Sequence, residues 1–478
     1  MKRILSVFLV VLPLGAQGPA APATQALSGV VRLNKLPISE EVLQVKLPRP
    51  VERPLSNGLK LLVVESHRVP NITLQIRIPT GDLRNPPELL GLSDATAALI
   101  RLGTKTMNAK AIADRLADLG ATLSIGSGQD SGTIFVSAMT ENFDGALALL
   151  TDVLLNPTFP EDEFVKWKTR TKAQLEQMQS QPGFLANEEM LKVLYPDDSR
   201  RYARPTVASL DKMTRNDVVE HYRKFYVPSG QWAGIAGDIT PAEAVAKLEK
   251  ALGGWKGGPV ARVSMSLPEP IAEKKVFLIP RPNSVQTYLM VVNRAIGRLN
   301  PDYIQCQVMN RVLGAGPSSR LFRNIREEKG YTYGIGSGFA STRVMNYFNA
   351  STSVRTEVTE PALAELLREF RDIRDRAVPA AELADARSAI VSGFVLGLES
   401  SSAVLSRWME QREYGLPEDY WDTYSQKVSA VTAEDVQRVA KKYVPAENAQ
   451  IIAVGDAGKI AELLKKFGPV EDVGAGGK

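Results

Sequence analysis

Residues 119–128 read LGATLSIGSG, and residues 329–338 read KGYTYGIGSG. The shared positions lie at a constant offset of 210: Gly120, Thr122 and Ile125 correspond to Gly330, Thr332 and Ile335. Further along, KMTRNDVVEHYRKFYVPSGQWAGIAGD at 212–238 is echoed by AVTAEDVQRVAKKYVPAENAQIIAVGD at 430–456. Self-similarity over so long a distance indicates two copies of a whole domain, because solenoid repeats have much shorter periods.

Length and composition agree with a duplication. The chain has 478 residues, of which 44% are hydrophobic, and this length favours two domains with large cores. The formal net charge is +5, and the mature part of the sequence contains no long basic run. Nucleic acid is therefore not expected as a partner.

The first 23 residues read as an export signal. Lys2 and Arg3 precede an apolar stretch at 4–12, and small residues follow at 15–16 and at Ala21 and Ala23. The alternative, an uncleaved anchor, needs about 20 apolar residues, which this stretch lacks. We predict a signal peptide at 1–23 and a periplasmic or secreted protein with no stable membrane anchor.

Cysteine usage adds little to this. No cysteine stands near the end of the leader, so the lipid acceptor of bacterial lipoproteins is missing. Cys306 is the only cysteine, which excludes an intramolecular disulfide. It stands in the helical pattern YIQCQVMNRVL, where we expect a small buried side chain.

Within each copy, strand-like and helical patterns alternate. LKLLVVES and ITLQIRIP read as strands, whereas GLSDATAALIRL and FDGALALLTDVLL have helical spacing, so the fold class is α+β. Residues 253–270 are rich in Gly and Pro and mark the connection between the copies. The expected organisation places an N-terminal extension at 24–47, the first domain at 48–255, a linker at 256–272, the second domain at 273–470 and a tail at 471–478.

Two long motifs carry a family resemblance. GLSDATAALIRLGT at 91–104 and NRVLGAGPSSRLFRNIREEKGYTYGIGSGF at 310–339, with the paired Y-V-P…G-D endings, resemble the pitrilysin or insulinase-like peptidases of family M16. The resemblance covers nearly the whole chain after the leader. It implies two homologous α/β sandwich domains of the LuxS/MPP-like type, each a mostly antiparallel sheet covered by helices, closing like a clam shell around a peptide.

The zinc motif of that family is degenerate here. The family carries His-x-x-Glu-His on a helix, where two imidazoles four residues apart grip Zn²⁺ and the Glu activates water. In this chain the two ligand positions hold Asp94 and Ala98, and the position of the catalytic Glu holds Ala97. Glu176 stands near the downstream ligand position, but a solvated helix residue is the plainer interpretation. We therefore expect no metal and no catalytic residue in this chain.

The only two histidines do not restore such a site. His67 lies in a turn-like segment and His221 in an amphipathic helical segment, 154 positions apart. We expect both to be surface or half-buried side chains. Neither stands in a nucleophile motif of the Ser-His-Asp kind.

The second-domain motif is intact. The resemblance implies that Arg326 and Tyr333 hold the substrate backbone opposite the zinc, as a guanidinium and a phenol can donate to a peptide carbonyl. The alternatives are an ion pair of Arg326 with Glu327 or a helix carboxylate, and an ordinary strand aromatic at Tyr333. The preceding segment at 313–322 predicts a turn into a helix with Ser318 or Ser319 as N-cap. It lacks the G-K-S/T of a phosphate loop.

Several bacterial members of this family work as heterodimers, in which one chain supplies the zinc helix and the other the Arg/Tyr pair. The sequence therefore predicts the second kind of chain: a subunit that binds peptide substrates, with an HxxEH-bearing M16 partner holding the zinc. The alternative is a noncatalytic peptide-binding or scaffold protein of the same fold. A self-sufficient metallopeptidase is disfavoured by the shortage of histidine.

Overall fold

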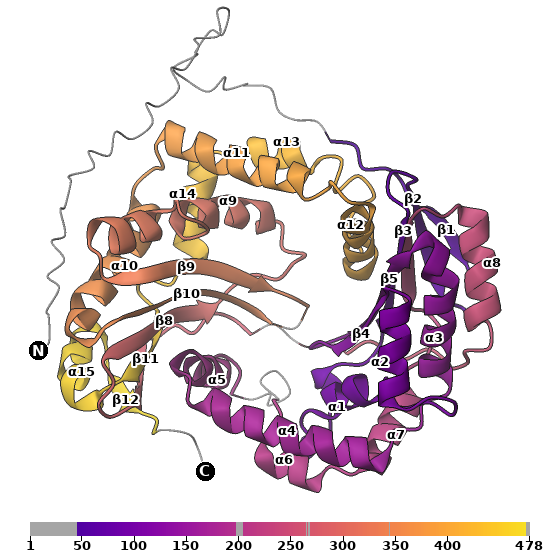
Figure 1. The fold of residues 1–478 in the computed structure, drawn as a ribbon. Coiled ribbons are helices and arrows are strands. Elements are labelled where there is room, and N and C mark those ends of the chain that lie inside the picture. Colours follow the sequence, from indigo (N-terminus) through magenta and orange to yellow (C-terminus); the bar gives the residue numbers. More distant parts are fainter. Residues whose placement is uncertain (1–44, 197–203, 264, 266–267, 344, 475–478) are drawn as a thin grey trace, which may run out of the picture. The chain divides into compact units, whose positions relative to one another are not determined.

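The computed structural model describes residues 45–196, 204–263, 265, 268–343 and 345–474. The predicted signal peptide at 1–23, most of the N-terminal extension and the end of the tail lie outside the described residues. The described residues contain two six-stranded mixed sheets, each packed with helices (Figure 1). The predicted α+β class is confirmed.

The first sheet has the strand order β1-β2-β6-β3-β5-β4, and the second has the order β12-β7-β11-β8-β10-β9. The strands of the first sheet are β1 Val51–Pro54, β2 Lys60–Glu65, β3 Asn71–Ile78, β4 Thr122–Ser127, β5 Gly132–Met139 and β6 Trp232–Gly237. Those of the second are β7 Lys275–Pro280, β8 Gln286–Arg294, β9 Thr332–Ser341, β10 Asn346–Arg355, β11 Gln450–Gly455 and β12 Val470–Asp472.

Five strands of each sheet have the same connectivity, because β2-β6-β3-β5-β4 has the order of β7-β11-β8-β10-β9. In each sheet the first and the last of these five strands along the chain pair in parallel: β2 with β6, and β7 with β11. The other neighbouring strands of the five pair antiparallel. Gly120 and Gly330 precede the matching strands β4 and β9 with φ of 55° and 62°. This left-handed conformation favours glycine and accounts for the repeated residue.

The sixth strand breaks the symmetry. β1, from the start of the described chain, pairs antiparallel with β2, whereas β12, from its end, pairs parallel with β7. The same edge of the duplicated unit is thus completed by opposite ends of the chain.

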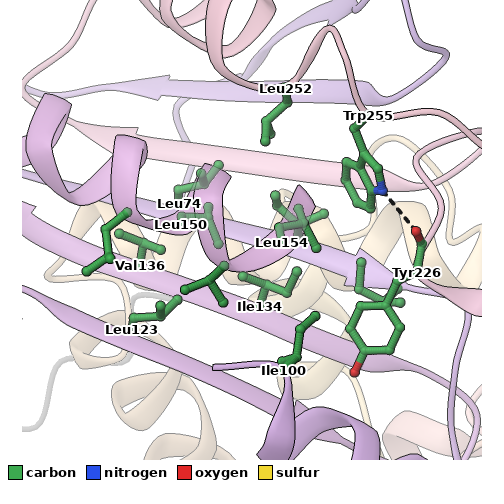
Figure 2. Close-up of a cluster of buried hydrophobic side chains, with 14 of the residues drawn as sticks. Leu74, Ile100, Leu123, Ile134, Val136, Leu150, Leu154, Tyr226, Leu252 and Trp255 are labelled. Carbon is green, nitrogen blue, oxygen red and sulfur yellow. Dashed lines mark hydrogen bonds between the residues drawn. The ribbon is translucent and has the colours of Figure 1, made fainter. Parts of the chain in front are cut away.

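One face of the first sheet is covered by helices from the same half of the chain. Leu74, Ile134 and Leu150 are fully buried there, and the Trp255 indole Nε1 donates to the Tyr226 carbonyl over 2.9 Å beside them (Figure 2). The helices of this layer are α1 Leu92–Leu99, α2 Ala109–Asp118, α3 Phe143–Leu155, α4 Glu161–Gln179, α6 Val207–Lys212, α7 Arg215–Phe225 and α8 Pro241–Leu252.

The second sheet is covered in the same way by helices of the second half. Phe348 of β10 meets Phe370 of α10 edge-on, with ring centroids 5.5 Å apart, and the predicted burial of Cys306 on α9 is confirmed. The helices are α9 Tyr303–Leu313, a π-helix at Phe322–Glu328, α10 Thr359–Asp375, α11 Ala380–Leu396, α13 Tyr424–Ser429, α14 Ala433–Tyr443 and α15 Ala457–Leu464.

The other face of each sheet is covered by a helix from the opposite half. α5 (Pro182–Leu194) contacts β8 and β11 of the second sheet, and α12 (Ser401–Tyr414) contacts β2 and β6 of the first. Gly234 of β6 permits the close approach of α12, because a Cβ there would lie 2.6 Å from the Leu405 side chain. The two halves therefore exchange one helix each.

Among the described residues no single helix is long and apolar enough to cross a membrane. The pair α11 and α12, which is bent by 111°, has the length and apolar composition of a membrane span only when the two helices are taken together.

The exchanged helix α12 is anchored by Trp408, which is 1% exposed and donates from Nε1 to the Pro48 carbonyl over 2.9 Å. Replacing Trp408 with Ala leaves a cavity between α12 and the first sheet. We expect it to lower the free energy of unfolding by about 3–5 kcal/mol in urea denaturation. Val165→Ala, at a side chain that is 53% exposed, serves as the control and should change stability by less than about 0.5 kcal/mol. Equal effects of the two substitutions would contradict this anchoring role.

Candidate functional site

The helix with the degenerate zinc motif, α1, is fixed at its first turn. Gly91 precedes it with φ of 88°, and a Cβ there would lie 2.8 Å from the Pro205 ring. The Ser93 backbone N–H donates to the Asn85 side chain and the Ser93 hydroxyl donates to Asp82, each over 2.9 Å. The helix therefore keeps a defined position although the family's metal ligands are missing.

The three motif positions offer one polar side chain. Ala97 is buried, Ala98 is partly buried, and Asp94 is partly exposed. Burial and the nearby Asp82 carboxylate raise the pKa of Asp94 to about 7. One carboxylate, from Asp94, and the two methyl groups of Ala97 and Ala98 do not supply the imidazole, thiolate and carboxylate donors that tetrahedral Zn²⁺ needs, so the residues present do not fit that ion.

Glu176 does not complete a ligand set. It is an exposed residue of α4, a helix that packs against α1. In the described part of the chain, no three His, Cys, Asp or Glu side chains come together in a way that could hold a metal ion. No catalytic step is therefore derived from a metal on this chain.

Tyr226 is a polar residue beside this motif that the sequence reasoning missed. It is 3% exposed, and its hydroxyl has no hydrogen-bond partner among the described residues. Burial, together with the Asp94 carboxylate, raises the pKa of this phenol. Its signal in the sequence is the repeated Tyr-Val-Pro element, at Tyr226 and again at Tyr443.

The two histidines have opposite environments. His67 is exposed as predicted, with Nδ1 2.6 Å from Asp238 and Nε2 2.8 Å from Glu65, and these hydrogen bonds raise its pKa. The prediction for His221 was wrong, because it is only 4% exposed. Its Nε2 lies 2.7 Å from the Thr80 hydroxyl, and burial lowers the pKa of His221 to about 4.

The second motif brings its two predicted residues together. Arg326 lies in the π-helix Phe322–Glu328, and Tyr333 lies at the start of β9. The Arg326 guanidinium carbon is 4.6 Å from the Phe322 ring centroid and 5.6 Å from that of Tyr333. No ion pair found within the described residues includes Arg326, so the alternative pairing with Glu327 is not observed. Stacking on ring faces leaves the guanidinium N–H donors available to a ligand.

Tyr333 is unusually accessible, with 92% of its surface exposed. It borders an open groove of about 710 Å³ whose lining includes Tyr288, Thr352 and Arg355. The groove lies over β8, β10 and the start of β9, and β9 is the edge strand of the second sheet. A large, exposed aromatic side chain next to a cation at the edge of a sheet is suited to contact an extended peptide.

The segment that carries Arg326 is held from behind by acidic side chains. The Asn324 amide donates to Glu365 over 2.8 Å and to Glu369 over 2.9 Å, and Arg320 makes a two-nitrogen contact with Glu382. Ser319 directly precedes the helical residues, and its carbonyl accepts a backbone bond from Arg323, so it has the predicted N-cap position. Its hydroxyl donates to the Gly316 carbonyl instead of capping the helix. The helix position is therefore set by these side-chain contacts.

Two family models match most of the chain. Residues 60–201 match the family model "Insulinase (Peptidase family M16)", and residues 212–390 match "Peptidase M16 inactive domain". "Uncharacterized zinc protease YmxG" of Bacillus subtilis is 22% identical over 355 residues, covering 73% of this chain and 85% of that protein. "Non-peptidase homolog YmxG" of Helicobacter pylori is 21% identical over 409 residues, covering 84% and 90%.

The fold is also found in a solved structure. The crystal structure of a peptidase M16 inactive domain from Pseudomonas fluorescens superposes with a TM-score of 0.78 at 25% identity. The superposition covers 85% of this chain and 98% of that one.

The raised pKa of Asp94 gives a prediction for stability. The pKa of Asp94 is about 7 in the folded protein and 3.8 in the unfolded chain, so the folded state holds the proton more tightly. This contribution to stability is fully present below pH 3.8 and is lost as the pH rises towards 7. Asp94→Asn removes the ionisation, so we expect it to increase the free energy of unfolding at pH 8 by roughly 2–4 kcal/mol. The gain should vanish near pH 4. Urea denaturation at both pH values measures it, with the exposed Glu176→Gln as control. A gain that did not depend on pH would contradict the assignment.

Proposed function

Because the chain belongs to peptidase family M16, as its sequence motifs had indicated, we propose that it is the substrate-binding subunit of a two-chain zinc metallopeptidase that degrades or processes peptides. In this arrangement the zinc and its HxxEH helix belong to a second M16 subunit. The present chain contributes Arg326 and Tyr333. It is not catalytic alone.

The observation that carries the proposal is the contrast between the two motifs. At α1 the two ligand positions hold Asp94 and Ala98, which supply no imidazole, and the base position holds Ala97, which has no ionisable group. At β9 the Arg326 guanidinium is stacked on the exposed ring of Tyr333. A chain that had lost every peptidase function would have no need of this second arrangement.

The chemistry available to the pair is hydrogen-bond donation. The guanidinium has five N–H donors and stays charged at any working pH, and the Tyr333 hydroxyl is a further donor. Both suit a peptide carbonyl oxygen, and donors placed there would stabilise the negative oxygen that develops during hydrolysis. Phe322 and Tyr333 restrict the guanidinium, so less conformational freedom is lost on binding.

The edge of the second sheet supports binding of an extended peptide. β9 is the last strand of this sheet and pairs only with β10. On its outer edge Ser337 donates from its backbone N–H to the Gly314 carbonyl over 3.1 Å and accepts at its carbonyl from the Asn310 amide over 3.0 Å. The groove lies over β8, β10 and the start of β9, where Tyr333 stands. A peptide added to a free strand edge is held by main-chain hydrogen bonds, with loose selection of side chains. This mode suits a subunit that handles many peptides.

The test is peptide hydrolysis by this chain mixed with an HxxEH-bearing M16 subunit. Arg326→Ala and Tyr333→Phe should each lower turnover roughly 10-fold to 1000-fold, as expected for one lost oxyanion or backbone contact. Tyr333→Phe keeps the ring on which Arg326 stacks and removes only the hydroxyl. Gel filtration should show that the two subunits still associate.

Matched controls separate this role from stability. Arg323→Ala removes a guanidinium one helical turn away that pairs with Glu382, and Tyr443→Phe removes a hydroxyl of α14 that donates to Asp302 outside the groove. Both controls should leave turnover nearly unchanged. This chain alone should hold no stoichiometric zinc and cleave no peptide. Undiminished turnover in the Arg326→Ala/Tyr333→Phe double variant would favour the alternative of a noncatalytic peptide-binding or scaffold protein.

We place this function in the periplasm or outside the cell, on the basis of the leader at 1–23. The mature protein should lack residues through at least Ala16. Mass spectrometry of the protein recovered from the periplasmic fraction measures its N-terminus. An exported chain that retained Met1 would contradict this assignment.

A further inference from the structure

A small cavity of about 140 Å³ lies where the first sheet, the connecting segment and the second half of the chain meet. Its charged lining consists of four arginines and two carboxylates: Arg77, Arg84, Arg262, Arg343, Asp130 and Glu413. The arginines come from four separate segments, namely the end of β3, the 3-10 turn Asp82–Arg84, the connecting segment, and the turn between β9 and β10. The lining therefore carries an excess of two positive charges.

One carboxylate is already engaged. Glu413 of α12 lies 3.4 Å from the Arg77 Nε and accepts a hydrogen bond from the Ser131 hydroxyl over 3.3 Å. Arg77 also donates to the Thr133 hydroxyl over 2.5 Å. Arg77 and Glu413 thus form an ion pair in one wall of the cavity, although the Arg77 Nε has no hydrogen-bond acceptor.

Arg84 and Arg343 contact neutral groups. Arg84 donates to the Ala261 carbonyl over 2.7 Å and lies 5.2 Å over the Phe225 ring. Arg343 lies 5.1 Å over the Tyr414 ring. No carboxylate found among the described residues stands within 4 Å of the guanidinium nitrogens of Arg84, Arg262 or Arg343. Asp130 acts from a longer distance on Arg84 and, together with Glu413, on Arg262.

The arrangement costs free energy when the cavity holds only water. The Arg84 Nε is buried without a hydrogen-bond acceptor. Burial lowers the pKa of Arg84, and burial together with the charge of Arg343 lowers the pKa of Arg262. Like charges brought together, and a buried donor left unpaired, both disfavour the folded state.

We infer that this cavity is a binding site for a small oxyanion, recognised by the guanidinium groups of Arg84, Arg262 and Arg343. The planar fork of an arginine matches two oxygens of a carboxylate or phosphate at once. A volume of about 140 Å³ admits one such group and excludes a nucleotide. The two sources with this chemistry are free inorganic phosphate and the C-terminal carboxylate of a peptide. This site is separate from Arg326 and Tyr333, so it does not depend on the proposed peptidase role.

The test is calorimetric titration of the complete chain, without a partner subunit, in a low-salt chloride buffer. The probes are inorganic phosphate, N-acetyl-triglycine and its C-terminal amide. We expect saturable binding of phosphate or of the peptide acid that weakens with added salt, and no binding of the amide. Binding of the acid identifies a peptide terminus as the ligand, and binding of phosphate alone identifies the free ion; both support the site.

Substitutions decide whether the arginines are responsible. Arg262→Gln and Arg343→Gln should each weaken binding roughly ten-fold, as for one lost charge-assisted contact. The control is Arg376→Gln, which should have no effect on binding. The Arg376 side chain is 76% exposed and stands at the end of α10, outside the cavity lining.

A second measurement does not need the ligand. Without anion, Arg262→Gln should raise the midpoint of thermal unfolding, because it removes a repelled charge, whereas Arg376→Gln should not. Arg262 is exposed, so this variant should fold even if Arg84→Gln does not. Absence of binding up to about 10 mM phosphate and peptide acid, or equal binding by the wild type and an Arg262→Gln/Arg343→Gln variant, would overturn the inference.

Discussion

The exchange of α5 and α12 between the halves is the interaction on which the rest of the structure depends. The central strands are apolar on both faces: all six residues of β11 are buried, and so are the four inner residues of β2. Such a sheet is stable only when both faces are covered. Each half supplies helices for one face of its own sheet and relies on the other half for the second face. The duplicated domains are therefore not independent folding units.

This constraint explains why the degenerate half keeps its architecture. The helix α5 follows α4 in the half with the missing ligands, yet its buried residues, including Met190 and Leu194, pack under β8 and β11. Tyr288 of β8 lines the groove beside Tyr333, and Gly183 at the start of α5 lies next to the Tyr288 ring. Loss of zinc ligands at α1 removes chemistry from one half, while the packing that half provides to the other remains necessary.

Much of this could be predicted from the sequence, and the limits have physical reasons. The repeat, with Gly120 matched by Gly330, predicted two like domains, and the resemblance to family M16 implied that Arg326 and Tyr333 act together, which their spacing alone did not indicate. The helix exchange could not be predicted, since apolar spacing says that a face is buried and not what covers it. His221 was misjudged because a short amphipathic pattern fits either a half-buried or a fully buried imidazole. The cavity arginines are separated by up to 266 positions, and only the folded chain brings them together.

The edge strands differ in a way that affects the behaviour of the protein in solution. β1 (VERP) and β12 (VED) carry charges, and β1 ends in proline, which are the features that prevent one sheet from pairing with another. At the opposite edges, β4 (TLSIGS) and β9 (TYGIGSGFAS) have no charged residue. These two strands therefore lack the charges and prolines that discourage edge-to-edge pairing, and their outer edges are the places where a strand of another molecule can add most readily.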